Sequence, residues 1–259
     1  MDLDASKNLL TLKHDRDSNL EVKTTPTTGI TVDEYRIDIK RTNSATWYVL
    51  STNKTMTPWH ANAAGGFHLR GMAKIGGTEC YSTNVVVEVR FPSAAEIQGG
   101  AGVQVRMDQA WSDTRTATTT NSRREEGYYI TLDTSSNAYG IVGHTIGTPV
   151  ANDVGASWDT ATFPRPADSI VNPSPLDTVT YTVGWFHTHT PTTYRSVGRG
   201  VGPSVADGGW SSDPGINIPG YAYDYVESPA GSGSIPAGHP IDSPAQIYTI
   251  TPPVRRPTP

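Results

Sequence analysis

The sequence predicts a two-domain, β-rich protein, and three observations lead to this fold class. The 259 residues exceed the length of a typical domain, which is about 100 to 200 residues. Charged residues make up 17% of the chain, and 25 Gly and 20 Pro supply many turns, a composition that favours short strands over long helices. Several segments also alternate apolar and polar residues, which is the period-two pattern of a half-buried strand.

The N-terminal part divides into two segments. Residues 1–30 show no such periodicity and contain the turn-rich run TTPTTG, so they are expected to form a tail or linker. Residues 31–97 carry strand patterns about every ten to fifteen residues, separated by Gly, Asn and Thr. The patterns occur in the runs YRIDIK, WYVL, GGFHLR and NVVVEVRF. This spacing predicts a small antiparallel sandwich of immunoglobulin-like type over residues 31–97.

Residues 98–250 are expected to form the second domain. Its first predicted strand runs through Val103, Val105 and Met107, which alternate with polar residues. The final segment, TPPVRRPTP at residues 251–259, is too rich in proline for a folded core and is expected to be an extended tail.

The charge pattern and the lack of long apolar runs exclude several classes of partner. The net charge is −5 and no block of Lys or Arg occurs, so nucleic acid is not an expected partner. The N-terminal segment lacks the apolar core of a signal peptide, and no stretch of about 18 apolar residues indicates a membrane span. The chain is therefore expected to be soluble, and to act in the cytoplasm or as a delivered or extracellular part of a larger system.

The run VTYTVGWFHTHTP predicts a strand that carries two histidines on one face. Same-face neighbours on a strand lie about 7 Å apart, so two imidazoles can converge on one metal ion. The residues expected to share this face are Val179, Tyr181, Val183, Trp185, His187 and His189.

A third metal ligand follows a glycine-rich loop, where GPSVAD supplies Ser204 and Asp207. At this spacing both side chains can face the same side of the first turn of a helix or of a tight loop. Two neutral histidines and one carboxylate leave the fourth tetrahedral position open, as in a catalytic zinc site. Asp213 and Asp224 are alternatives to Asp207, although neither has a serine three residues earlier.

The order of FHTHTP and GPSVAD resembles the His-x-His-Pro and Ser-x-x-Asp signature of the JAMM (JAB, MPN-plus) metallopeptidases, a family that includes deubiquitinating enzymes and bacterial relatives. His187, His189, Ser204 and Asp207 match the motif position by position. Thr190 stands where the family often has proline, and the loop that leads to Ser204 is longer than usual. The resemblance covers about residues 120–227 and implies that the two histidines and Asp207 bind Zn²⁺ while Ser204 helps to hold the oxyanion.

The resemblance also implies a glutamate on an earlier strand that activates the water. The run SRREEGYYITLD supplies two candidates. Glu125 is favoured, because RREEGYYI resembles the start of this strand in bacterial JAB-like domains attached to toxin and Rhs-type proteins, and Glu126 is the alternative. For residues 98–250 the resemblance implies an α/β JAB/MPN-like (cytidine-deaminase-like) fold, with at least one helix expected after Asp207 or between about 105 and 120.

These features lead to one functional hypothesis and two alternatives. The first is a zinc-dependent metallohydrolase that cleaves a peptide or isopeptide bond in a protein or peptide substrate, ubiquitin-like proteins included. The second is a non-catalytic binding or structural module of a larger assembly, in which the immunoglobulin-like domain supplies contact surface. The third is a toxin-effector hydrolase with another substrate.

Overall fold

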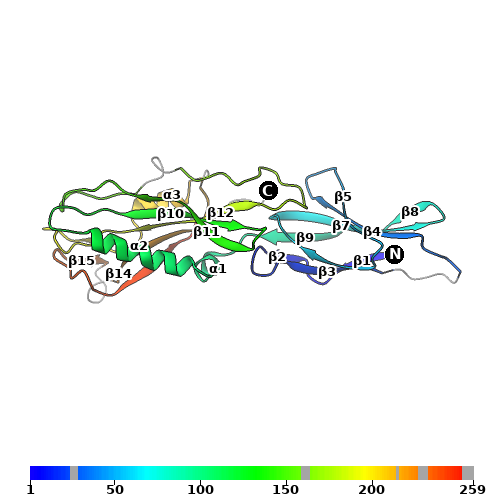
Figure 1. Cartoon of the computed structure of the whole chain (residues 1–259), viewed down its shortest axis with the longest axis horizontal. Helices are drawn as coiled ribbons and strands as arrows, with labels where there is room; N and C mark the ends of the chain where they lie inside the picture. Colours follow the sequence, from blue (N-terminus) through cyan, green and yellow to red (C-terminus); the bar gives the residue numbers. More distant parts are fainter. Residues whose placement is uncertain (24–28, 159–163, 214–215, 227–232, 253–259) are drawn as a thin grey trace.

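The computed structural model describes residues 1–23, 29–158, 164–213, 216–226 and 233–252. It is β-rich, as predicted, with several sheets and a small number of helices. Figure 1 shows an elongated molecule, in which the strands of the first 90 residues gather at one end and the helices with the later strands gather at the other.

Two sheets form from the first 90 residues. One has three antiparallel strands, β1 (Asp2–Ala5), β3 (Asp17–Lys23) and β6 (Met56–His60). The other has the order β2-β9-β7-β4-β5, with β8 paired to β7, and β2 pairs with β9 in parallel. Its strands are β2 (Leu9–Thr11), β4 (Glu34–Arg41), β5 (Tyr48–Thr52), β7 (Gly65–Ile75), β8 (Thr78–Tyr81) and β9 (Val85–Arg90).

The prediction that residues 1–30 form a tail or linker is wrong. Leu20 and Val22 of β3 are buried, and so are Leu3 and Leu10. β1 and β2 have only four and three residues, and the alternation of β3 rests on two apolar residues, Leu20 and Val22. Their burial depends on partners far along the chain, since β3 pairs with β6 and β2 pairs with β9. The N-terminal sheets therefore begin at Asp2 rather than at residue 31.

One hydrophobic core continues from the N-terminal sheets into the C-terminal half. It contains Leu20 and Trp59 from the smaller sheet, Phe67 from the larger one, and Tyr128 and Tyr181 from later strands. The backbone amide of Ala64 also donates a hydrogen bond to the Tyr181 hydroxyl, at 3.0 Å. Each fully buried large apolar side chain stabilises the fold by about 1.5–3 kcal/mol, so packing where the two halves meet contributes to the stability of both.

A five-stranded sheet organises the C-terminal half, in the order β11-β10-β12-β14-β16. The β12–β14 pair is parallel and the other pairs are antiparallel. The strands are β10 (Glu126–Asp133), β11 (Ala138–Ile146), β12 (Thr180–Thr188), β14 (Gly220–Tyr225) and β16 (Ala245–Ile250). A separate two-stranded ladder joins β13 (Arg199–Gly200) to β15 (Ser234–Ile235).

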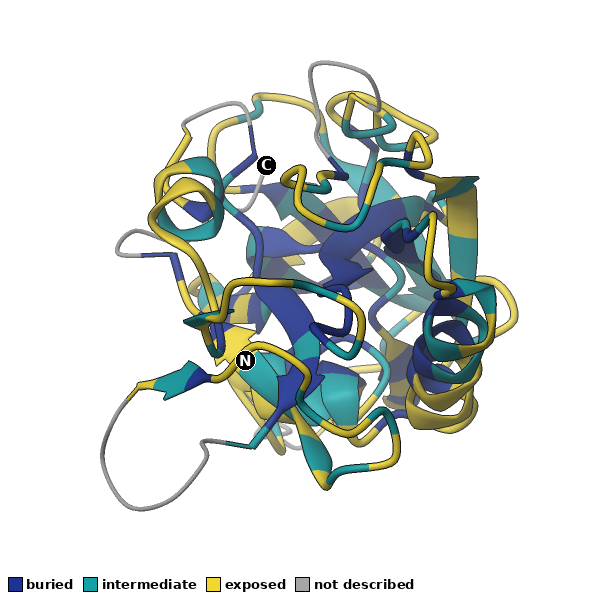
Figure 2. Cartoon of the chain, turned by 90° about the vertical axis from the view of Figure 1, so that its left-hand side faces the viewer, coloured by how far each residue is buried: buried dark blue, intermediate teal, exposed yellow. Residues whose placement is uncertain are grey.

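Helices lie on both faces of this sheet. On one face, Trp111 of α2 (Val103–Ala117) stacks on Tyr223 of β14, and the short α1 (Ala94–Gln98) precedes α2. On the other face, Trp210 of α3 (Val205–Ser211) contacts Trp185 of β12. Figure 2, a view along the molecule, shows the buried strands at the centre and partly exposed helices outside them.

The predicted strand through Val103, Val105 and Met107 is wrong, because these residues form the first turns of α2. Val103, Met107 and Ala110 are buried at helical spacing, whereas Val105 is 68% exposed. A short run that alternates apolar and polar residues fits both periods, and only the position of the sheet decides between them. At least one helix is expected, between about 105 and 120 or after Asp207, and α2 occupies the first of these places. At the second, α3 begins at Val205 and so contains Asp207 in its first turn.

A bulge in β12 corrects the predicted arrangement of its side chains. The register between β10 and β12 shifts between Ile130 and Thr131, so β12 contains one additional residue there. Upstream of the bulge, Tyr181 packs against Phe91 in the core that also contains Phe186. Downstream of it, Trp185 lies with Trp210 on the opposite face. The residues from Val179 to His189 therefore do not all share one face.

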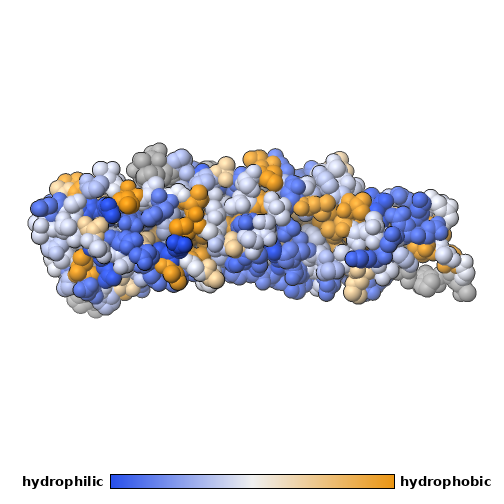
Figure 3. Space-filling view, viewed as in Figure 1, coloured by the Kyte–Doolittle hydropathy of each residue, from blue (hydrophilic) through white to orange (hydrophobic). Residues whose placement is uncertain are grey.

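The surface in Figure 3 carries apolar residues in separate patches among polar ones. Within the described ranges, no helix is both long and apolar enough to cross a lipid bilayer. Residues 253–259 of the expected C-terminal tail lie outside the described part of the chain.

We expect Leu20→Ala to lower the free energy of unfolding by about 2–5 kcal/mol, because it removes a buried side chain and leaves a cavity. Urea denaturation followed by tryptophan fluorescence measures this change. The control is Leu9→Ala, since Leu9 is 58% exposed and its truncation should change stability little. Equal stability of wild type and Leu20→Ala would mean that the N-terminal strands are not part of the folded core.

Candidate functional site

The two histidines of the HTH run lie side by side at the end of β12. His187 is the penultimate residue of the strand, and the backbone amide of His189 continues the ladder by donating to the carbonyl of Tyr223, at 2.9 Å. The centroids of the two imidazole rings are 4.8 Å apart. Both residues are buried, so they can hold a ligand with little competition from solvent.

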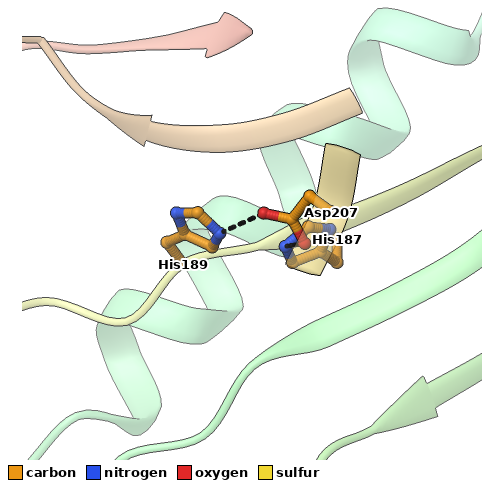
Figure 4. A group of neighbouring side chains, drawn as sticks. All are labelled: His187, His189 and Asp207. Carbon is orange, nitrogen blue, oxygen red and sulfur yellow. Dashed lines mark ion pairs between the residues drawn. The ribbon is translucent and has the colours of Figure 1, made fainter. Parts of the chain in front are cut away.

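Asp207 comes to the histidines from the first turn of α3. Ser204 is the N-cap of this helix: its hydroxyl oxygen accepts from the Asp207 amide at 3.2 Å, and Asp207 Oδ2 accepts from the Ser204 amide at 2.6 Å. This capping box satisfies two free amides of the helix end. It also fixes the Asp207 carboxylate, which lies between the two imidazoles in Figure 4.

These three side chains lie close enough together that they could hold one metal ion. Asp207 Oδ1 lies 3.4 Å from His187 Nε2, and Asp207 Oδ2 lies 3.4 Å from His189 Nε2. One ligand atom from each residue lies within 4.8 Å of the others. Ligands at about 2.0–2.1 Å from a tetrahedral zinc ion are roughly 3.3 Å from one another. Two imidazole nitrogens and a carboxylate oxygen are also ligands that zinc accepts in catalytic sites.

Asp224 orients His189 from behind. Its Oδ2 lies 3.0 Å from His189 Nδ1, which turns Nε2 of that ring towards Asp207. Burial alone would raise the pKa of Asp224, but the hydrogen bonds from Arg199 and His189 outweigh burial and hold this pKa at about 2. A carboxylate on the far nitrogen of a ligating histidine fixes its tautomer and increases its basicity. Asp224 therefore positions His189. Asp213, the other alternative ligand, lies beyond the end of α3 and outside the group that could hold a metal.

His187 is oriented by stacking. The indoles of Trp158 and Trp185 lie at 8° and 14° to its ring, with centroids 6.2 and 5.4 Å away. Its Nδ1 is buried and has no hydrogen-bond partner among the described residues. Burial, together with the nearby charge of His189, lowers the pKa of His187 to about 4. The ring is thus neutral near pH 7, which is the form that binds a metal.

Glu125 is the glutamate that the structure brings to this group. It directly precedes β10, is buried, and accepts a hydrogen bond from the Trp158 amide at 3.0 Å. Burial raises the pKa of Glu125 to about 7. Glu126 instead lies 3.2 Å from His144 and 3.7 Å from Arg124, and it lines a different depression.

The candidate residues open into one pocket of about 440 Å³. Glu125, His187, His189, Ser204 and Asp207 all contribute to its wall. The structure thus brings together these five residues from three separate segments of the chain, whereas the alternatives Glu126, Asp213 and Asp224 do not line the pocket.

Sequence reasoning missed several residues of the pocket, which also include Arg123, Trp158, Arg195 and Arg199. Trp158 approaches β10 at Gly127, where a Cβ atom would lie 2.4 Å from the indole. Gly127 in the sequence indicates that another group can approach the backbone closely. It does not indicate that this group is the indole of Trp158. The three arginines lie in or beside loops without periodicity, so no local pattern marked them.

No family model matches the chain, and the searches of curated proteins and of solved structures likewise found no match. The resemblance to the JAMM metallopeptidases therefore stays a prediction.

We expect Asp224→Asn to weaken zinc binding by about 10- to 100-fold, because the amide supports the His189 ring less well than a carboxylate does. Competition with a chromogenic chelator measures the affinity. Asp242→Asn is the control, since the side chain of Asp242 is 92% exposed. Circular dichroism checks the fold, because the change also leaves Arg199 without its carboxylate partner. An unchanged affinity in a folded Asp224→Asn variant would contradict the orienting role.

Proposed function

We propose that the chain is a zinc-dependent hydrolase that cleaves a peptide or isopeptide bond with an activated water molecule. The observation that carries the proposal is the convergence of Glu125 with His187, His189 and Asp207 in one pocket. A structural zinc site has four protein ligands, whereas three ligands beside a carboxylate base are typical of catalysis.

The proposed role of each residue follows from the position of its side chain. A zinc ion at this site would act as a Lewis acid and lower the pKa of a water molecule. Glu125 then takes the proton and returns it to the leaving amine, a task for which a pKa of about 7 is well matched. His187, His189 and Asp207 would hold the metal, and Asp224 would keep His189 in the required tautomer.

Ser204 is proposed to stabilise the oxyanion. Its hydroxyl oxygen already accepts from the Asp207 amide, which leaves the hydroxyl hydrogen free to donate. Ser204 is exposed at the rim of the pocket, so a substrate carbonyl can reach it. A donor of this kind stabilises charge that develops in the transition state.

The proposed fold and substrate class follow from the same resemblance. A five-stranded sheet with helices on both faces supports the JAB/MPN-like assignment, and two N-terminal sheets that share a core support the immunoglobulin-like one. The substrate is proposed to be a protein or peptide, and the N-terminal sheets would offer contact surface to a larger assembly.

Elemental analysis of protein purified without a histidine tag tests the metal site. We expect about one zinc per chain in the wild type, since three ligands converge at one point, and none in the His187→Ala, His189→Ala double variant. The His14→Ala, His68→Ala double variant is the control, because both residues lie in the N-terminal half of the chain. A wild-type chain that holds no metal after zinc is supplied would refute the hydrolase and favour a binding module.

The role of Glu125 is tested by Glu125→Gln in the zinc-loaded protein. We expect zinc content to persist and hydrolysis to fall by a factor of about 10²–10⁴, because a positioned base contributes this much. A panel of peptide and isopeptide substrates with fluorescent leaving groups provides the assay, and Glu126→Gln is the matched control. Loss of activity in the control alone would assign the base to Glu126.

A further inference from the structure

Three arginines share the pocket with the candidate zinc ligands. Arg123 lies before β10, Arg199 begins β13, and Arg195 lies in the loop between β12 and β13. Arginine is the residue best suited to recognise carboxylates, because its planar guanidinium donates two parallel hydrogen bonds. Only an arginine whose guanidinium is not already engaged by the protein can bind a substrate in this way.

Two of the three are fully engaged by the protein. Arg123 donates to the carbonyl of Asn152 at 3.0 Å and also to the Val154 carbonyl and the Thr190 hydroxyl. Arg199 forms two hydrogen bonds with the Asp224 carboxylate, at 2.5 and 2.6 Å, and donates to the Thr190 carbonyl. Both guanidinium groups therefore hold the walls of the pocket in place.

Arg195 has no such role among the described residues. Its Nε is buried and has no hydrogen-bond partner, and no ion pair with Arg195 occurs in the described ranges. Hydrogen bonds from the amide and hydroxyl of Ser196 to Asp153 Oδ1, at 2.9 and 3.0 Å, and secondly the charge of Arg195 lower the pKa of Asp153. Arg195 therefore interacts with Asp153 through its charge, and no hydrogen bond between the two side chains occurs among the described residues. A buried donor without a partner is costly, so Arg195 is prepared for a partner that enters from the pocket.

The charge of the pocket points to an anionic partner. Arg199 and Asp224 neutralise each other. Asp207 and the partly ionised Glu125 would offset only part of the two positive charges that a zinc ion would bring. Arg123 and Arg195 remain, so the wall carries net positive charge in a chain whose overall charge is −5. Such a local field attracts negatively charged substrates.

We propose that Arg195 binds a carboxylate of the peptide substrate beside the bond that is cleaved. The role of Arg195 rests on the proposed function, because it requires that the pocket binds a peptide. It adds the feature of the peptide that the pocket recognises. The carboxylate can be the C-terminus of the peptide or the side chain of an acidic residue. In either case the guanidinium of Arg195 supplies both the charge and the paired donors.

The test uses three N-acetylated alanine-based hexapeptides and isothermal titration calorimetry with the zinc-loaded Glu125→Gln chain. The first peptide has a free C-terminal carboxylate, the second is amidated and contains one glutamate, and the third is amidated and neutral. We expect one or both acidic peptides to bind about 10- to 100-fold more tightly than the neutral one, as charge-assisted hydrogen bonds do. The peptide that is preferred identifies the source of the carboxylate.

Introducing Arg195→Ala into the zinc-loaded Glu125→Gln chain should remove the preference for acidic peptides. It should leave the weak binding of the neutral peptide unchanged. Arg106→Ala is the matched control, because Arg106 is exposed on α2 and lines a different depression. Zinc content and circular dichroism establish that the site and the fold of each variant persist. A preference that survives Arg195→Ala, equal binding of all three peptides, or no binding of any would overturn the proposal.

The binding experiment and the proposed function can fail separately. A wild-type chain that binds zinc and prefers an acidic peptide but cleaves none would keep the role of Arg195 and refute the hydrolase. A chain that cleaves acidic and neutral peptides with the same kcat/KM, in wild type and Arg195→Ala alike, would keep the hydrolase and refute the role of Arg195.

Discussion

The buried carboxylate of Asp224 is the contact on which the geometry of the candidate site depends. It accepts from Arg199, from the Gly202 amide and from the Tyr225 amide, and it lies against Nδ1 of His189. Gly202 has a φ of +73°, a conformation that glycine adopts without strain. The chain passes from there to Ser204 and into α3. One carboxylate thus orients His189 and fixes the path of the loop that leads to Asp207. Removing one partner from such a buried ion pair commonly costs about 3–5 kcal/mol.

The parts of the structure that could be predicted are those that depend on neighbours in sequence. The pair His187 and His189 follows from the period of a strand, and Ser204 with Asp207 follows from the spacing of a helix cap. The choice between Glu125 and Glu126 depended on the phase of β10, and the structure places the first in the pocket and the second on another surface. Asp224 was recognised only as an alternative ligand, because its contact with His189 arises from the parallel pairing of β12 and β14.

The parts that could not be predicted depend on contacts between distant segments. The strands of residues 1–23 have too few apolar positions to reveal their burial without β6 and β9. The alternation at Val103 and Val105 fits a strand as well as a helix. The segment forms the helix α2 because it packs on the face of a sheet that is built from distant segments. The bulge in β12 has no sequence signal, yet it decides that Trp185 and His187 face α3 while Phe186 faces the main core.

The apolar core runs without a break from one end of the molecule towards the other, which couples the stability of the two ends. Because Trp59 and Phe67 share their packing with Tyr128 and Tyr181, the N-terminal sheets cannot melt without exposing the base of the strand that carries the histidines. A ligand that binds only the folded state stabilises the whole cooperative unit by mass action. Occupancy of the pocket would then slow hydrogen exchange in β3 and β7, so amide protection at one end of the molecule would report on ligand binding at the other.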